Sequence, residues 1–114
     1  MVGRIAGKQE RAGRSLPVRF FERPADVVAR ELIGAVIEVR AGQAVTRGRI
    51  VETEAYLGVD DPASHAFAHR RHAGNVSVYG APGTWYVYRS YGIHWCANLT
   101  AGGLPIAAAV LLRA

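Results

Sequence analysis

The sequence is poor in cysteine and in lysine, and it has no long apolar run. Cys96 is the single cysteine and Lys8 the single lysine among 114 residues. One cysteine excludes an internal disulfide framework and a zinc site built on several thiolates, so we expect a reducing compartment. The longest apolar stretch, LPIAAAVLL at residues 104–112, is shorter than the roughly 20 residues that a membrane helix needs. We therefore expect a cytoplasmic protein with no membrane partner.

Acidic residues are also few compared with basic ones. Thirteen arginines and one lysine stand against nine acidic residues, which gives a formal charge of +5 and a pI near 10.0. A balance of this kind favours a polyanionic partner such as nucleic acid. A chain of 114 residues can bury one hydrophobic core, which predicts a single domain.

The first residues look unlike the remainder. Residues 1–16 carry four basic side chains among glycine and alanine, with few large apolar groups to bury. This composition predicts a mobile basic arm at 1–16, followed by the folded domain at 17–114.

Local patterns predict an α+β fold, a single domain with a curved antiparallel sheet and flanking helices. Residues 24–32 predict a packing helix, and the stripe that it would bury is Val27, Val28, Leu32 and Ile33. Residues 35–40 and 46–57 predict two antiparallel strands around a turn at 41–43. The apolar run at 106–113 predicts a central strand, whereas residues 58–81 lack periodicity and predict a long functional loop.

A protruding β-hairpin is predicted for residues 84–89 and 93–99, with Tyr91 exposed at its tip. A loop of three residues would give the pairs Tyr88 with His94, Tyr86 with Cys96, and Thr84 with Asn98. The opposite, apolar face would then hold Trp85, Val87, Ile93, Trp95 and Ala97.

The stretch RGRIVETEAYLG at residues 47–58 carries the strongest chemical pattern. Strand alternation places Ile50, Glu52, Glu54 and Tyr56 on one face. Such a face is common as a charged, solvent-facing edge, but a carboxylate there can also act as a general base in hydrolysis. Spacing alone makes Glu52 and Glu54 equal candidates.

Two segments resemble one known family. IVETEAYLG and the later segment PGTWYVYRSYGIHWCANL, at residues 82–99, resemble the alkyladenine, or 3-methyladenine, DNA glycosylases. The resemblance covers the chain from Phe20 onward and corresponds to about the first half of that family's catalytic domain, so we expect an incomplete family domain. It implies a monofunctional base-excision repair enzyme that flips alkylated purines out of double-stranded DNA and hydrolyses the N-glycosidic bond without a cofactor. A monomer is expected, associated with the nucleoid in a bacterium or nuclear in a eukaryote.

The resemblance also implies a role for individual residues. Glu54 matches the residue that activates water, and Arg113 matches one that helps to hold this water. Tyr91 matches an aromatic wedge that fills the gap left by the flipped base. The residues matching those that contact this base are Tyr56, His65, Tyr88 and Asn98.

Two alternative functions stay open. If the second half of the domain is absent, the chain could be a catalytically incomplete module that binds damaged DNA. The spacing of His65, His69 and His72 also suggests a metal-dependent hydrolase. The adjacent Arg70 and Arg71, and the lack of an HExxH motif, favour a protein without a metal site.

Overall fold

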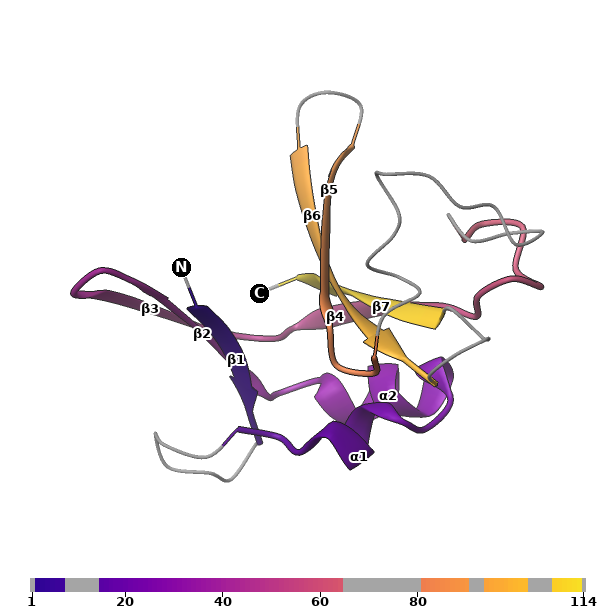
Figure 1. Cartoon of the computed structure of the whole chain (residues 1–114), viewed down its shortest axis with the longest axis horizontal. Coiled ribbons are helices and arrows are strands. Elements are labelled where there is room, and N and C mark those ends of the chain that lie inside the picture. The colour runs from indigo at the N-terminus through magenta and orange to yellow at the C-terminus, as the bar shows by residue number, and fades with distance from the viewer. Residues whose placement is uncertain (1, 8–14, 65–80, 91–93, 103–107, 114) are drawn as a thin grey trace.

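The computed structural model describes residues 2–7, 15–64, 81–90, 94–102 and 108–113. The described parts form two antiparallel sheets and two short helices, which confirms the α+β class but replaces the single predicted sheet by two (Figure 1). Neither helix has the length and apolar character of a membrane-spanning segment. The elements are β1 (Val2–Ala6), α1 (Val18–Phe21), α2 (Ala25–Leu32), β2 (Val36–Ala41), β3 (Ala44–Arg49), β4 (Glu52–Tyr56), β5 (Trp85–Ser90), β6 (His94–Ala101) and β7 (Ala108–Arg113).

The smaller sheet has the order β1-β2-β3, and its first strand is formed by residues 2–6 of the segment that was expected to be a mobile arm, 1–16. β1 pairs with β2 along its whole length, and Ile5 is buried in the core. The backbone N–H of Leu16 donates to the Ile5 carbonyl at 2.8 Å, so the chain returns to β1 before α1 begins. The strand is stabilised by the burial of Ile5 and by pairing with β2, which is distant in the sequence. The composition of residues 1–16 does not show this pairing. Residues 8–14 lie outside the described part.

The predicted strand 46–57 is wrong in one respect, because it divides into β3 and β4 at Ile50 and Val51. The N–H of Ile50 donates to Ala35 at 2.8 Å, whereas the N–H of Val51 donates to Arg113 at 2.9 Å. β3 therefore stays with β2, and β4 joins β7 in the other sheet. Ile50 is 1% exposed and lies in the core. The prediction that it shares a face with Glu52 is therefore wrong.

The larger sheet has the order β4-β7-β6-β5, with β7 in the interior as predicted. The predicted register between β5 and β6 is wrong by two residues: Tyr86 pairs with Asn98, and Tyr88 pairs with Cys96. A shift of two keeps each side chain on its predicted face, because the side-chain period of a strand is two. The face predicted to be apolar is only partly buried, because Val87 is 51% exposed.

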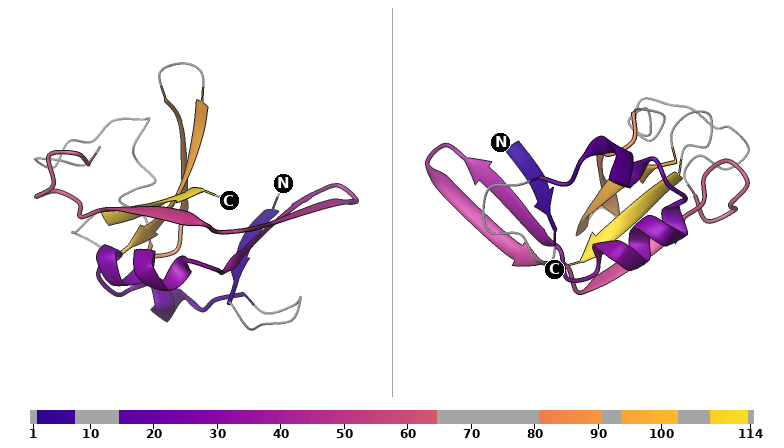
Figure 2. Two further views of the ribbon diagram at one scale, coloured as in Figure 1. Left: turned by 180° about the vertical axis from the view of Figure 1, so that it is seen from behind. Right: turned by 90° about the horizontal axis from the view of Figure 1, so that it is seen from below.

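Helix α2 covers one face of the larger sheet, and the views in Figure 2 agree with this packing. Val28 and Leu32 are fully buried against Val110 and Leu99, and burial of each such side chain contributes about 1.5–3 kcal/mol. The Thr53 hydroxyl of β4 donates to the Ala29 carbonyl at 2.8 Å and links the strand to the helix.

The predicted helix at 24–32 is confirmed, but its buried stripe differs. Ala25 and Ala29 are buried with Val28 and Leu32, whereas Ile33 is 38% exposed. Ile33 follows the last helical residue and has a non-helical ψ of 126°, so it leaves the stripe. Helix α1 was not predicted.

Candidate active site

The face of the larger sheet opposite α2 carries a row of side chains that crosses all four strands. Glu54 on β4 lies opposite Leu111, Leu111 lies opposite Asn98, and Asn98 lies opposite Tyr86. Directly opposite residues in an antiparallel sheet project to the same face. The fold therefore brings Glu54 and Asn98 to one surface, two strand spacings or about 10 Å apart.

Glu54 has two partners on its own surface, and both contact the same carboxylate oxygen. The Tyr56 hydroxyl donates to Oε2 of Glu54 at 3.1 Å, and Nη2 of Arg113 lies 3.6 Å from this oxygen. Within the described residues, Oε1 of Glu54 makes no hydrogen bond and is free to accept one from water. The carboxylate is 43% exposed, so solvent reaches it.

Arg113 joins the two glutamates that sequence spacing could not separate. Its Nη1 donates to Oε1 of Glu52 at 3.2 Å, while its Nη2 faces Glu54. Each of these side chains is more than 40% exposed, and exposed ion pairs contribute only about 0–1 kcal/mol to stability. The effect of Arg113 is therefore mainly to orient the two carboxylates.

The surroundings of the two glutamates differ in a way that favours Glu54. Glu52 is 59% exposed, and Arg113 is its one hydrogen-bond and ion-pair partner among the described residues, whereas Glu54 is less exposed and also accepts the Tyr56 hydrogen bond. Of the two glutamates, only Glu54 lies in the row that contains Asn98. A fixed and partly enclosed carboxylate is the better candidate for positioning a water molecule.

Tyr56 stays a hydrogen-bond donor at neutral pH. Partial burial raises the pKa of its phenol, and the hydrogen bond and negative charge of Glu54 raise it further. The end of β4 is held by Asp61, whose carboxylate accepts the backbone N–H groups of Leu57 and Ala63, each at 2.9 Å. This turn fixes the strand directly after Tyr56.

Asn98 and Tyr86 form a buried part of the same face. Asn98 is 2% exposed, and its Nδ2 donates to the Tyr86 carbonyl at 3.2 Å. Tyr86 is 5% exposed, and burial raises the pKa of its hydroxyl. Sequence analysis did not select Tyr86, although the strand period already placed it on the face of Asn98.

Of the remaining predicted site residues, Tyr88 belongs to the described part of the chain. The backbone of Tyr88 lies on β5 opposite Cys96, on the strand face that also carries Tyr86. His65 and Tyr91 lie outside the described residues, as do His69 and His72. Within 2–7, 15–64, 81–90, 94–102 and 108–113, no group of three or more His, Cys, Asp or Glu side chains could hold a metal ion.

A surface hollow lies away from the row that contains Glu54. It is next to the two helices and is lined by Pro17, Arg19, Phe20, Arg23 and Glu31. The Arg23 guanidinium lies over the Phe20 ring, 4.5 Å from its centroid, so a cation–π contact holds these two lining residues together. The hollow contains none of the predicted site residues, so we assign it no role in the site.

Comparison with known proteins adds an independent finding. Residues 19–114 match the family described as methylpurine-DNA glycosylase (MPG). The match includes both segments singled out in the sequence and every predicted site residue, while β1 precedes it.

Curated bacterial proteins are similar over most of the chain. A protein of Agrobacterium fabrum is 54% identical over 99 residues, which are 87% of this chain and 47% of that protein. Proteins of Granulibacter bethesdensis and Koribacter versatilis are 48% and 46% identical over 99 residues; these are 87% of this chain and 44% and 47% of the two relatives. All three carry the name "Putative 3-methyladenine DNA glycosylase". The chain spans about half the length of the curated relatives it matches.

Proposed function

The chain belongs to the methylpurine-DNA glycosylase family, and from this premise we propose that the protein acts in base-excision repair. Its substrate is double-stranded DNA that contains alkylated purines, 3-methyladenine among them. The reaction hydrolyses the N-glycosidic bond between the damaged base and its sugar. A cytoplasmic, DNA-associated location fits this function, and the formal charge of +5 fits a polyanionic substrate.

In the proposed reaction, Glu54 takes a proton from water as the water oxygen bonds to the anomeric carbon. The bond from this carbon to the purine breaks, and the base leaves with the bonding electrons. The observation that carries this assignment is the contact of Tyr56 and Arg113 with one oxygen of Glu54, while its other oxygen has no partner among the described residues. The carboxylate also stabilises positive charge that develops on the sugar.

Recognition of the damaged base is proposed for the aromatic and amide residues of the same surface. The base must leave the duplex stack before its glycosidic bond can be reached. Tyr56, Tyr88 and His65 would enclose the flipped base, and Asn98 would discriminate against normal guanine. Tyr91 would fill the gap in the duplex. Aromatic faces favour cationic alkylated purines, because cation–π attraction adds to stacking.

The test is base release from alkylated duplex DNA by Glu54→Gln and Glu52→Gln variants. Loss of a general base lowers rates by about 10² to 10⁴. We expect a loss of this size for Glu54→Gln, with binding to abasic DNA retained, and near-normal release by Glu52→Gln, its matched control. An inactive Glu52→Gln beside an active Glu54→Gln would contradict the assignment.

The same assay should be run with this chain and with one extended at the C-terminus, because the relatives are about twice as long. Release only by the longer chain would favour the second candidate function for the 114-residue chain, a module that binds damaged DNA without completing the reaction. In either case, the comparison of Glu54 with Glu52 is made in the active chain.

A further inference from the structure

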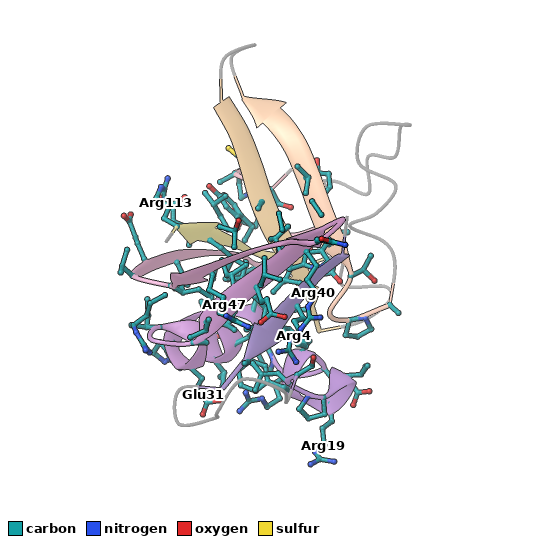
Figure 3. All side chains as sticks on the ribbon, turned by 90° about the vertical axis from the view of Figure 1, so that its left-hand side faces the viewer. Arg4, Arg19, Glu31, Arg40, Arg47 and Arg113 are labelled. Carbon is teal, nitrogen blue, oxygen red and sulfur yellow. The ribbon has the colours of Figure 1, made fainter. Side chains whose placement is uncertain are left out.

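The outer face of the three-stranded sheet carries three arginines around one carboxylate. Arg4 on β1 and Arg47 on β3 lie directly opposite Glu38 on β2, and Arg40 follows two residues later on the same face. Their Nε atoms lie 2.9 Å, 2.7 Å and 2.9 Å from Glu38 oxygens for Arg4, Arg47 and Arg40. Figure 3 labels Arg4, Arg40 and Arg47, which lie together at this sheet; with Glu38 we call them the arginine cluster.

Around Ile5 the other face of this sheet packs inward, whereas Arg40 and Arg47 of the cluster are exposed to solvent. Ile5 is 4% exposed in the core, and Ile37 packs against it. The Trp85 ring approaches Gly3 so closely that a Cβ there would lie 3.3 Å from ring atoms. Partners for the cluster must therefore approach from outside the molecule.

Glu38 is itself 3% exposed, because the arginines cover it. Its hydrogen bonds to Arg4, Arg40 and Arg47 hold its pKa at about 2, so it is a carboxylate at neutral pH. The bonds to Nε fix the orientation of each guanidinium plane. Among the described residues, the terminal nitrogens of Arg40 and Arg47 make no hydrogen bond or ion pair, and these side chains are 58% and 50% exposed.

The charges in this cluster do not balance. Three guanidinium groups meet one carboxylate, which leaves two positive charges in excess on a small surface. A cluster that served stability alone would gain from a second carboxylate, since like charges repel at this distance. Guanidinium groups that are already oriented and present free N–H donors match the geometry of phosphate oxygens.

We propose that the arginine cluster binds the phosphate backbone of duplex DNA, away from the site around Glu54. The choice of DNA as the anion rests on the proposed function. The existence of an anion-binding site is inferred from the geometry and charge of the arginine cluster alone. The longest dimension of the molecule is 40 Å, close to one helical turn of DNA at about 34–36 Å. A duplex of about one turn therefore matches the molecule in length. Glu38 pre-orients Arg40 and Arg47 and reduces the entropy lost on binding.

The first experiment measures the salt dependence of binding to an undamaged duplex by fluorescence anisotropy. Each lost phosphate contact lowers the log-log salt slope by about 0.9. The Arg40→Gln/Arg47→Gln double variant should lower the slope by about 1.8. The control is Arg19→Gln/Arg30→Gln, which removes the same charge from exposed positions on α1 and α2 and should leave the slope nearly unchanged. Equal slopes for the two double variants would overturn the proposal.

The second experiment separates pre-orientation from net charge. Glu38→Gln makes the chain more positive, so attraction through net charge alone predicts tighter DNA binding. The arginine cluster predicts the opposite, a loss of about tenfold, because the guanidinium groups are no longer fixed. Circular dichroism verifies that the variant is folded. Tighter binding by folded Glu38→Gln would overturn the pre-oriented cluster.

These measurements are independent of catalysis. A lower salt slope for the Arg40/Arg47 variant, together with no base release by any chain, would retain the DNA surface and reject the proposed reaction. Normal base release with an unchanged slope would retain the reaction and reject the surface.

Discussion

The Tyr56 hydroxyl donates to Glu54 at 3.1 Å, the shortest side-chain contact that the described residues show between two predicted site residues. Burial raises the pKa of Tyr56 first, and Glu54 raises it further through its hydrogen bond and charge. Glu54→Gln removes the negative charge, offers the Tyr56 hydroxyl a weaker, neutral acceptor, and leaves burial in place. We therefore expect the pKa of Tyr56 to fall in this variant, as measured by ultraviolet difference titration.

A Tyr56→Phe variant identifies the transition that belongs to Tyr56, since Tyr86 also has a raised pKa. Glu52→Gln is the matched control, because Glu52 does not contact the Tyr56 hydroxyl. An equal fall of the tyrosine pKa in both glutamine variants would show that net charge, and not the hydrogen bond at 3.1 Å, controls this phenol.

Glu38 links stability to pH through the three arginines that bond to it. Its pKa is about 2 in the folded chain, against an ordinary value of 4.5, so the unfolded chain binds this proton more readily. The stabilisation is therefore present above pH 4.5 and is lost as the pH falls toward 2. Between these limits, the free energy of unfolding should fall more steeply for the wild type than for Glu38→Gln.

Urea unfolding at successive pH values measures this difference. Glu22→Gln, which removes an exposed carboxylate, should retain the steep wild-type profile. Parallel pH profiles for the wild type and Glu38→Gln would contradict the role of the cluster in acid stability.

At the scale of the elements, the connection into β5 depends on one close approach. Gly83 has a φ of +81°, and a Cβ there would lie 3.0 Å from the Phe21 ring of α1. Gly83→Ala should lower the free energy of unfolding by about 1–3 kcal/mol, since strain in the backbone adds to steric overlap. The measurement is urea unfolding monitored by circular dichroism.

Gly42 provides the control for this substitution. It also has a positive φ, +60°, but nothing lies within 4 Å of an added Cβ. Gly42→Ala should therefore show only the left-handed backbone cost, about 1–2 kcal/mol. If Gly42→Ala lowered the free energy of unfolding as much as Gly83→Ala does, steric overlap with Phe21 would not be the cause of the effect at Gly83.

Sequence patterns predicted those elements whose partners are local or whose composition is uniform. The helix at 24–32, the turn near Gly42 and the interior position of β7 belong to this group. Alternation continues through Ile50 and Val51, so it could not show that the chain changes sheets there. The β5–β6 register was predicted wrongly because a shift of two residues keeps each side chain on its face. The hydrophobic pattern then defines the register weakly, and the turn residues alone do not fix it.

The candidate site shows the same limit. Period-two alternation placed Glu52, Glu54 and Tyr56 on one face, but it gave no reason to prefer either glutamate. The distinction comes from the Tyr56 hydroxyl, which donates to Glu54, whereas Arg113 contacts both carboxylates and reaches Glu52 from 61 residues away. The contacts of Arg113 depend on the pairing of β4 with β7, which local patterns do not show.

At the scale of the whole molecule, the near absence of lysine from these 114 residues limits what this chain can do after base release. Strand cleavage through a Schiff base needs a nucleophilic amine near the sugar, and Lys8 is the only lysine. Arginine cannot replace it, because its guanidinium stays protonated. We expect base release by the 114-residue chain to leave intact abasic sites, with no covalent adduct trapped by borohydride. Gel electrophoresis of labelled duplex measures both results.

Lys8→Ala is the control for this expectation. It should release bases at the wild-type rate and also yield no adduct. An adduct that forms with the wild type and disappears in Lys8→Ala would contradict the water mechanism assigned to Glu54.

The change of sheet at Ile50 and Val51 gives the molecule a built-in pair of reporters. Their adjacent amides donate to different places, Ile50 to Ala35 beside β2 and Val51 to Arg113 at the end of β7. Opening of the smaller sheet frees the first amide, and opening of the larger sheet frees the second. Hydrogen exchange at two consecutive peptide groups therefore records whether the sheets open separately or as one cooperative unit.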